Sequence, residues 1–222
     1  MNMSSFLAPL VLLSQNTPAP QLRDGSYLQV QYLRSVKLTK SPYKSIRDGG
    51  LLQFDITRED GRLVLTTIAN FHDTGGTYRL TAKGTFLRDG GLDPTDTLIV
   101  SPTKGSTFRL NFPKDLVGEF EYVGSVDDFL RAYTIAGDYL DSRGKRYIFA
   151  TNGDARFPDR VFKYKVGSDH FESPFDYLYG DGFDWAFKVD GNTLKLYNHT
   201  DEGTNSKLES RPFLTLQRIQ IR

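Results

Sequence analysis

The amino-acid sequence predicts an all-β protein, a predominantly antiparallel up-and-down barrel with a short capping helix near the N-terminus. First, hydrophobic residues alternate with polar ones along residues 51–86, as in strands with one buried face. Second, about a dozen strand-like segments recur at intervals of roughly 8–12 residues, separated by turn sequences, as in β-barrels and β-sandwiches. Third, no long helical segments separate these strands, which excludes parallel βαβ units.

Length and charge narrow the class of protein. The chain has 222 residues, which suits one large all-β domain or two small ones, and we expect a single barrel domain over residues 22–222. The 28 Lys and Arg residues balance 27 Asp and Glu, so the sequence predicts no nucleic-acid partner. The chain has no cysteine, which excludes disulfides, thiolate metal ligands and a cysteine nucleophile. We expect neither a cofactor nor a metal.

Residues 1–21 differ from the rest of the chain and have two interpretations. Phe6–Leu13 is mostly apolar, and Ser14–Pro20 is polar and proline-rich, as in a secretory signal and its cleavage region. Because no Lys or Arg precedes Arg23, the basic region of a signal is missing, and a disordered tail is the alternative. The run is too short to span a bilayer, so no transmembrane segment is expected. We expect a periplasmic or secreted protein, and otherwise a cytoplasmic one.

A short helix is predicted close to the start of the ordered chain. Four apolar residues recur at the three-to-four-residue spacing of a helix: Leu28, Tyr32, Leu33 and Val36. Ser41-Pro42 ends this pattern, because the residue before a proline is pushed out of the helical conformation. Such a helix could cover one open end of the sheet.

The central segment predicts three antiparallel strands joined by two turns. Glu59-Asp60-Gly61 forms the first turn, where glycine supplies a positive φ. The strand after it, 63–71, is apolar on both faces, as in a central strand. The third strand, 77–86, alternates almost without interruption and directs Tyr78, Leu80 and Phe86 to one face.

The remainder of the chain repeats the hairpin pattern. Residues 97–101 and 107–112 pair across a turn. Residues 127–133 form either a helical turn capped by Ser125 or a strand edge. The expected later strands are 135–140, 146–151, 160–166, 175–179, 185–189, 193–198 and 213–221. Closure of such a meander into a barrel removes exposed strand edges.

The two ends of the ordered chain resemble the lipocalins and other calycins. Gly25-Ser26-Tyr27 stands near the start, successive hairpins follow, and Arg218 lies in the last strand. In that family a Gly-x-Trp motif opens the first strand, and a late arginine packs over the Trp ring at the base of the barrel. This sequence departs from the pattern in having Tyr27 in place of Trp, followed by a segment that favours a helix. The resemblance implies a cup of about eight to ten strands that holds a small, often apolar molecule.

No sharp catalytic motif is present, so the histidines are the first candidates for chemistry. The chain has no G-x-S-x-G, P-loop, H-E-x-x-H or dinucleotide-binding glycine motif. His72, beside Asp73 at the end of the most apolar strand, could act as a general base or fix the turn by a hydrogen bond. His170 and His199 fall in loop sequences, and nothing in their spacing indicates a zinc site.

A second candidate is the segment Asp176–Trp185, in which aromatic residues alternate with carboxylates and glycines. Such a segment resembles a sugar- or amine-binding rim, because flat rings stack on the ligand and acids accept hydrogen bonds. Paired acids can also hydrolyse a glycosidic bond at suitable separation. The alternative is a strand–turn–strand with a polar tip and buried aromatic rings.

These observations predict a non-enzymatic protein that binds a small, partly apolar ligand in a β-barrel cavity. The residues expected to line or close that cavity are Tyr27, Tyr32, His72, Asp73, Trp185 and Tyr197. One alternative is a hydrolase or isomerase that uses His72 with Asp73 or with the acids of Asp176–Trp185. Another is an envelope or scaffold protein whose barrel is filled by side chains.

Overall fold

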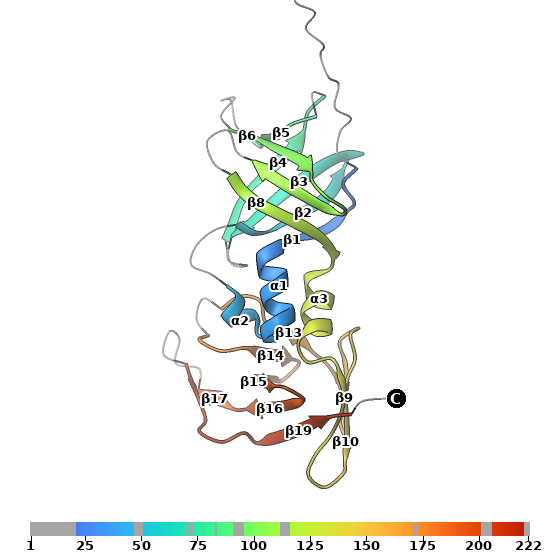
Figure 1. Cartoon of the computed structure of the whole chain (residues 1–222), viewed down its shortest axis with the longest axis vertical. Helices are drawn as coiled ribbons and strands as arrows, with labels where there is room; N and C mark the ends of the chain where they lie inside the picture. The colour runs from blue at the N-terminus through green and yellow to red at the C-terminus, as the bar shows by residue number, and fades with distance from the viewer. Residues whose placement is uncertain are drawn as a thin grey trace, which may run out of the picture.

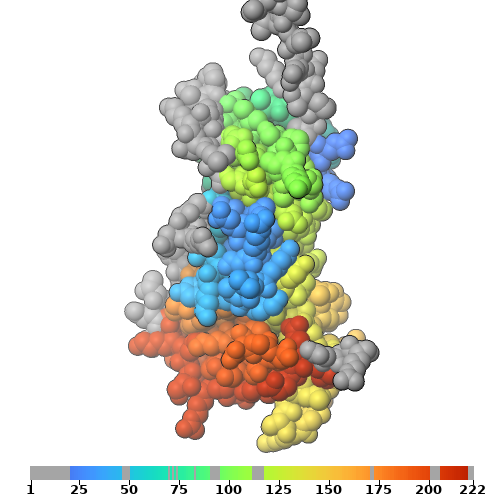
Figure 2. Space-filling view, in the orientation of Figure 1, coloured from blue at the N-terminus to red at the C-terminus, as the bar shows by residue number. Residues whose placement is uncertain are grey.

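The computed structural model describes residues 21–46, 51–69, 71, 73–82, 84–90, 96–111, 116–170, 173–200 and 206–219. The molecule is elongated, with a β-barrel at one end, helices in the middle and a second sheet at the other end (Figure 1). On the surface, too, the blue helical segment separates the green barrel from the orange and red sheet (Figure 2).

The predicted antiparallel barrel is confirmed, and the first eight strands form it. They are β1 (Gly25–Gln29), β2 (Leu51–Glu59), β3 (Arg62–Ala69), β4 (Asp73–Leu80), β5 (Phe86–Arg88), β6 (Thr97–Pro102), β7 (Thr107–Asn111) and β8 (Leu116–Gly124). Each strand pairs with the next along the chain, and β1 also pairs with β8, which closes the barrel. Closure leaves no free strand edge in this sheet.

Aromatic and aliphatic side chains occupy the inside of the barrel. The Tyr27 ring stacks on Phe54 with 4.5 Å between centroids, and Phe120 meets Phe54 edge-on at 5.2 Å. Leu65, Phe86, Leu98 and Leu110 are fully buried in the same cluster. The alternation of residues along the strands produces this core, because every second side chain points inward.

The third strand of the central segment is shorter than predicted. β4 ends at Leu80, and a turn follows in which Thr81 N–H donates to the Thr85 carbonyl at 2.8 Å. Phe86 then begins β5 and lies opposite Leu80. The alternation runs through the turn because the turn returns Phe86 to the same inner face, and a period of two by itself does not reveal the reversal.

The three helices of the described residues lie between the two sheets. α1 (Val30–Thr39) follows β1 directly and ends at Lys40, whose φ of 57° is left-handed and whose N–H donates to the Val36 carbonyl. α2 (Pro42–Ser45) begins with proline at its first position, so Pro42 ends one helix and starts another. α3 (Val126–Tyr133) is capped by Ser125, so the structure decides in favour of a helix where the sequence leaves a helical turn and a strand edge open. No helix in the described part of the chain is long and apolar enough to cross a membrane.

The second sheet has nine antiparallel strands, in the spatial order β12-β11-β10-β9-β19-β16-β15-β14-β13. They are β9 (Gly137–Leu140), β10 (Arg146–Phe149), β11 (Asp154–Arg156), β12 (Val161–Lys163), β13 (Lys165–Val166), β14 (Tyr177–Gly180), β15 (Phe183–Asp190), β16 (Thr193–Tyr197) and β19 (Leu214–Arg218). A separate hairpin joins β17 (His199–Thr200) to β18 (Lys207–Leu208). The strands expected in one barrel are therefore divided between two sheets.

The two edges of the second sheet are consecutive in the chain. β12 pairs with β11, and β13 pairs with β14, with only Tyr164 between β12 and β13. Residues 161–166, which we call the seam, therefore form both edges of the sheet: 161–163 lie at one edge and 165–166 at the other. The sheet is nearly closed, and its strand order breaks at the seam.

The arginine of the last strand does not pack over Tyr27, as the lipocalin resemblance implies. Arg218 belongs to the second sheet, where its guanidinium carbon lies 5.2 Å from the centre of the Tyr139 ring. Its Nη2 donates to the Tyr139 hydroxyl at 2.7 Å. Tyr27, in the barrel, packs on Phe54 and Tyr122 instead. The implied contact is absent because the last strand of the chain, β19, belongs to the second sheet and not to the barrel that contains Tyr27.

Candidate functional site

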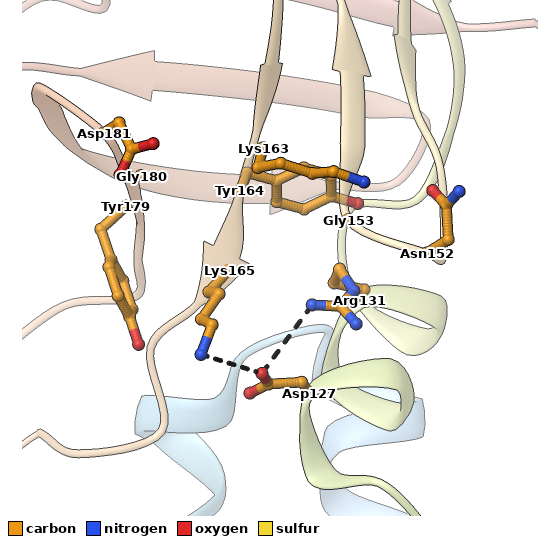
Figure 3. A pocket seen from close by; sticks show the side chains of 10 residues that line it. All are labelled: Asp127, Arg131, Asn152, Gly153, Lys163, Tyr164, Lys165, Tyr179, Gly180 and Asp181. Atoms are coloured by element: carbon orange, nitrogen blue, oxygen red, sulfur yellow. Dashed lines mark ion pairs between the residues drawn. The ribbon is translucent and has the colours of Figure 1, made fainter.

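A cavity of about 530 Å³ lies where the seam passes between α3 and the end of β14 (Figure 3). Its lining combines basic, acidic and aromatic side chains from α3, the turn before β11, the seam, the end of β14 and the turn after it. We call it the seam cavity. Its volume is in the range of small-molecule sites.

The seam places two lysines in the cavity by strand alternation. Phe162, Tyr164 and Val166 belong to the core of the second sheet, whereas Lys163 and Lys165 between them are exposed. Tyr164 holds the crossing point, because its N–H donates to the Gly153 carbonyl and its hydroxyl donates to the Ala150 carbonyl, both at 2.8 Å. Burial raises the pKa of the Tyr164 phenol, and the nearby Arg131 opposes that shift. The Tyr164 side chain is therefore uncharged and held in one position in the cavity lining.

Arg131, in the last turn of α3, is the most buried charge of the cavity. Only 7% of the residue is exposed. Its Nε donates to the Thr151 carbonyl at 2.7 Å, and Nη2 forms an ion pair with Asp128. Nη1 lies 4.0 Å from the Asp127 carboxylate. Hydrogen bonds and carboxylates together compensate for its desolvation, so the guanidinium is held in one orientation.

The other cations also have carboxylate partners. Lys165 Nζ lies 3.5 Å from Asp127 Oδ2, so Lys165 and Arg131 converge on one carboxylate from opposite sides (Figure 3). Lys163 pairs with Asp154, and the hydrogen bond from Lys163 lowers the pKa of that carboxyl. With each cation matched, the cavity offers donors and acceptors without a strong net field of one sign.

Two glycines keep the cavity walls close together. A Cβ on Gly180 would overlap the Lys163 carbonyl oxygen, which is backbone and cannot move aside easily. A Cβ on Gly153, which has a φ of +85°, would meet the Tyr164 carbonyl at 3.1 Å and Arg131 Nη1 at 3.4 Å. Side chains at either position would push the seam away from its neighbours.

The rim of the cavity has polar side chains on both sides and an aromatic ring on one of them. Tyr179 is 39% exposed and stands beside Lys165, with Asp181 beyond it, while Asn152 lies across the opening (Figure 3). The Asn152 side chain is oriented by Asp154, to which it donates through Nδ2 and from whose N–H it accepts, each at 3.0 Å. A ligand in the opening would meet one ring face, several donors and the carboxylate of Asp181.

A second cavity of about 450 Å³ lies between α2 and the second sheet, and Asp176 is its buried acid. The Tyr43 N–H donates to the Asp176 carboxyl at 2.8 Å, and the Ser41 hydroxyl hydrogen-bonds to it. Burial raises the pKa of Asp176 to about 6, against these hydrogen bonds. The contacts explain Asp176 as a link between α2 and the sheet.

The residues predicted from the sequence lie in separate parts of the molecule. Tyr27 belongs to the barrel core, Tyr32 and Trp185 belong to the core shared by α1 and the second sheet, and Tyr197 packs with Phe175. No group among the described residues forms a hydrogen bond with the buried Tyr32 hydroxyl. The structure does not bring these four side chains into one site.

The predicted His72–Asp73 pair is only partly visible. His72 lies outside the described residues, and Asp73 is an exposed residue at the start of β4. Within the described part of the chain, no group of three or more His, Asp or Glu side chains is arranged to hold a metal ion. General-base chemistry at His72 remains a prediction.

The sequence indicates one side of the seam cavity and gives no signal for the other. The predicted aromatic and acidic rim contains Tyr179 and Asp181, which line the cavity. Arg131 and the two seam lysines were not anticipated. The alternation of 161–166 indicates that Lys163 and Lys165 share a face, but their proximity to α3 depends on the tertiary fold.

Comparison with known proteins adds no family to this geometry. No family model matches the chain, and neither a curated protein nor a solved structure matches it.

Proposed function

We propose that the protein binds a small, neutral, hydroxyl-rich molecule of the carbohydrate class in the seam cavity and does not transform it. The observation that carries the proposal is the fixed Arg131 guanidinium in a cavity of about 530 Å³ whose cations are all paired with carboxylates. A matched set of donors and acceptors favours hydroxyl groups, which both donate and accept, over a strongly charged ligand.

The aromatic rim supports the same class of ligand. A sugar ring is partly apolar, since one face presents C–H groups that pack on an aromatic ring. Tyr179 offers such a ring beside Lys165, and Asp181 offers hydrogen-bond acceptors next to it (Figure 3). None of the ten lining residues is a serine, cysteine or histidine, so the lining has no activated nucleophile of those types.

The barrel is the less favourable place for the ligand that the sequence predicts. The stacked Tyr27 and Phe54 rings and their buried neighbours occupy its interior. This filling supports a second candidate role, in which the barrel is a scaffold whose outer face meets a partner. Membership of the lipocalin family also remains a proposal, supported by the closed eight-stranded up-and-down topology.

Isothermal titration calorimetry with a panel of neutral mono- and disaccharides tests the binding proposal. We expect one sugar to bind, and Tyr179→Ala to weaken that binding about fivefold through loss of ring stacking. Tyr133→Ala is the matched control, because Tyr133 is 38% exposed against 39% for Tyr179 and does not line the cavity. Absence of binding across the panel, or equal affinities of the two variants, would contradict the proposal.

A further inference from the structure

A cluster of aromatic rings lies on the opposite side of the seam from the seam cavity. Phe162 packs edge-on against Phe183 at 4.9 Å and against Trp185 at 5.9 Å. Phe157 lies parallel to Trp185 at 6.0 Å, and Phe213, 43% exposed, meets Trp185 at 5.3 Å. These rings come from four separate segments, and together they form an aromatic surface at the edge of the second core.

A cation of the chain already occupies this surface. The Arg160 guanidinium carbon lies 5.3 Å from the ring centres of Phe162 and Trp185, and 5.7 Å from that of Phe157. Three rings therefore face one positive charge within the distance at which the ring quadrupole attracts cations. Within the described residues, no carboxylate forms an ion pair with Arg160.

The absence of a paired carboxylate distinguishes Arg160 from the cations of the seam cavity. Arg131, Lys163 and Lys165 each have an acidic partner, so ion pairing holds them. Arg160 is an exposed residue held over the rings by contacts that are individually weak, about 0.5–1 kcal/mol at exposed sites. A guanidinium held this way can leave the rings at low cost.

We propose that Phe157, Phe162 and Trp185 form a binding site for a methylated ammonium group, which Arg160 fills when no ligand is bound. Guanidinium and methylated ammonium ions are both weakly hydrated, so aromatic faces compete well with water for them. Because successive strand residues face opposite ways, Phe162 is directed away from the side of the seam that carries Lys163. The site is therefore separate from the seam cavity and does not rest on the proposed sugar binding.

Trp185 is the only tryptophan of the chain, so its fluorescence reports directly on this cluster. The experiment is a titration of the full chain with tetramethylammonium chloride, with sodium chloride at equal ionic strength as the control salt. We expect a saturable change with tetramethylammonium only. Arg160→Ala should tighten binding about threefold, because the competing guanidinium is gone.

Two further variants make the outcome specific. Phe162→Leu keeps an apolar side chain but removes one ring face, and it should weaken binding at least twofold. Arg156→Ala removes an exposed arginine of β11 that contacts no ring in the described structure, and it should leave the affinity unchanged. Circular dichroism checks that each variant is folded.

The proposal is overturned if neither the wild type nor Arg160→Ala gives a saturable signal, or if sodium chloride gives the same signal. It is also overturned if Phe162→Leu binds as the wild type does. Should Arg160→Ala fail to fold, the wild-type and Phe162→Leu titrations decide the question alone.

Discussion

At the residue scale, Asp176 combines a structural role with an unfavourable charge. Its carboxyl accepts hydrogen bonds from the backbone at Tyr43 and from Ser41, and so connects α2 to the second sheet. Burial nevertheless raises its pKa from 3.8 to about 6. The folded protein therefore binds this proton more tightly than the unfolded chain does. This proton therefore contributes to the free energy of unfolding: the contribution is fully present below pH 3.8 and is lost as the pH rises through about 6.

Asp176→Asn should therefore become more stable than the wild type as the pH rises. The amide keeps an oxygen that can accept from Tyr43 N–H but has no charge to desolvate. We expect similar free energies of unfolding near pH 4 and an advantage of about 2 kcal/mol for the variant near pH 7. Urea denaturation at a series of pH values measures this difference.

The test uses the difference in the free energy of unfolding between variant and wild type, because His170 has the opposite effect on stability over the same pH range. Burial lowers the pKa of His170 from 6.5 to about 4, so its contribution to stability is lost as the pH falls from 6.5. His170 is common to both proteins and cancels in the difference. A difference in stability that stays constant from pH 4 to pH 7 would contradict the role given to Asp176.

At the element scale, α3 connects the barrel to the seam cavity. It begins two residues after β8 and carries both Asp127 and Arg131 into the cavity lining. The Ser125 hydroxyl accepts from the Asp128 N–H at 3.3 Å, and the two acids of the first turn suit the positive end of the helix dipole. These contacts stabilise the start of α3, although the local sequence alone is also compatible with a strand edge.

Ser125→Ala should destabilise the protein by about 1 kcal/mol, because one N–H at the start of α3 loses its partner. Ser142→Ala, in the exposed turn between β9 and β10, is the control and should change stability by less than about 0.5 kcal/mol. Thermal and urea denaturation followed by circular dichroism measure both. Equal stabilities of the two variants would show that the cap contributes nothing.

In the predicted strand over 160–166, the sequence pattern predicts which side chains are buried but not how the strand pairs. The alternation of Phe162, Tyr164 and Val166 is real, and all three residues belong to the core of the second sheet. The structure nevertheless divides the segment at Tyr164, since β12 and β13 pair with different neighbours. Alternation reports which face is buried, but it carries no information about which strand supplies the hydrogen bonds.

At the scale of the whole molecule, α1 holds the barrel and the second sheet against one another. Its buried residues Tyr32, Leu33 and Val36 share a core with Leu28 of β1 and with Phe187 of β15. Because this core is continuous from the first strand of the barrel to the second sheet, we expect the two sheets to unfold together.

Leu33→Ala should cost about 3 kcal/mol, since it leaves a cavity in this shared core. Leu38→Ala in the same helix is the control, because Leu38 is 85% exposed and its loss should cost less than about 0.5 kcal/mol. Urea denaturation should be followed by Trp185 fluorescence, which reports on the second sheet, and by far-ultraviolet circular dichroism, which reports on both. Two separate transitions would contradict a single cooperative unit.

The sequence by itself determined the class of fold, the first helix and most of the hairpins, and it left the segment after Ser125 open between a helical turn and a strand edge. These features depend on side chains a few residues apart, through alternation, helical spacing and turn residues. Only the tertiary structure decided that the strands divide into two sheets, that Arg218 packs on Tyr139, and that Lys165 reaches the same Asp127 carboxylate as Arg131. Those pairings join residues far apart in the chain, and the burial pattern of each strand is compatible with more than one partner. Their geometry depends on which strands pair and pack around each core, which no local pattern encodes.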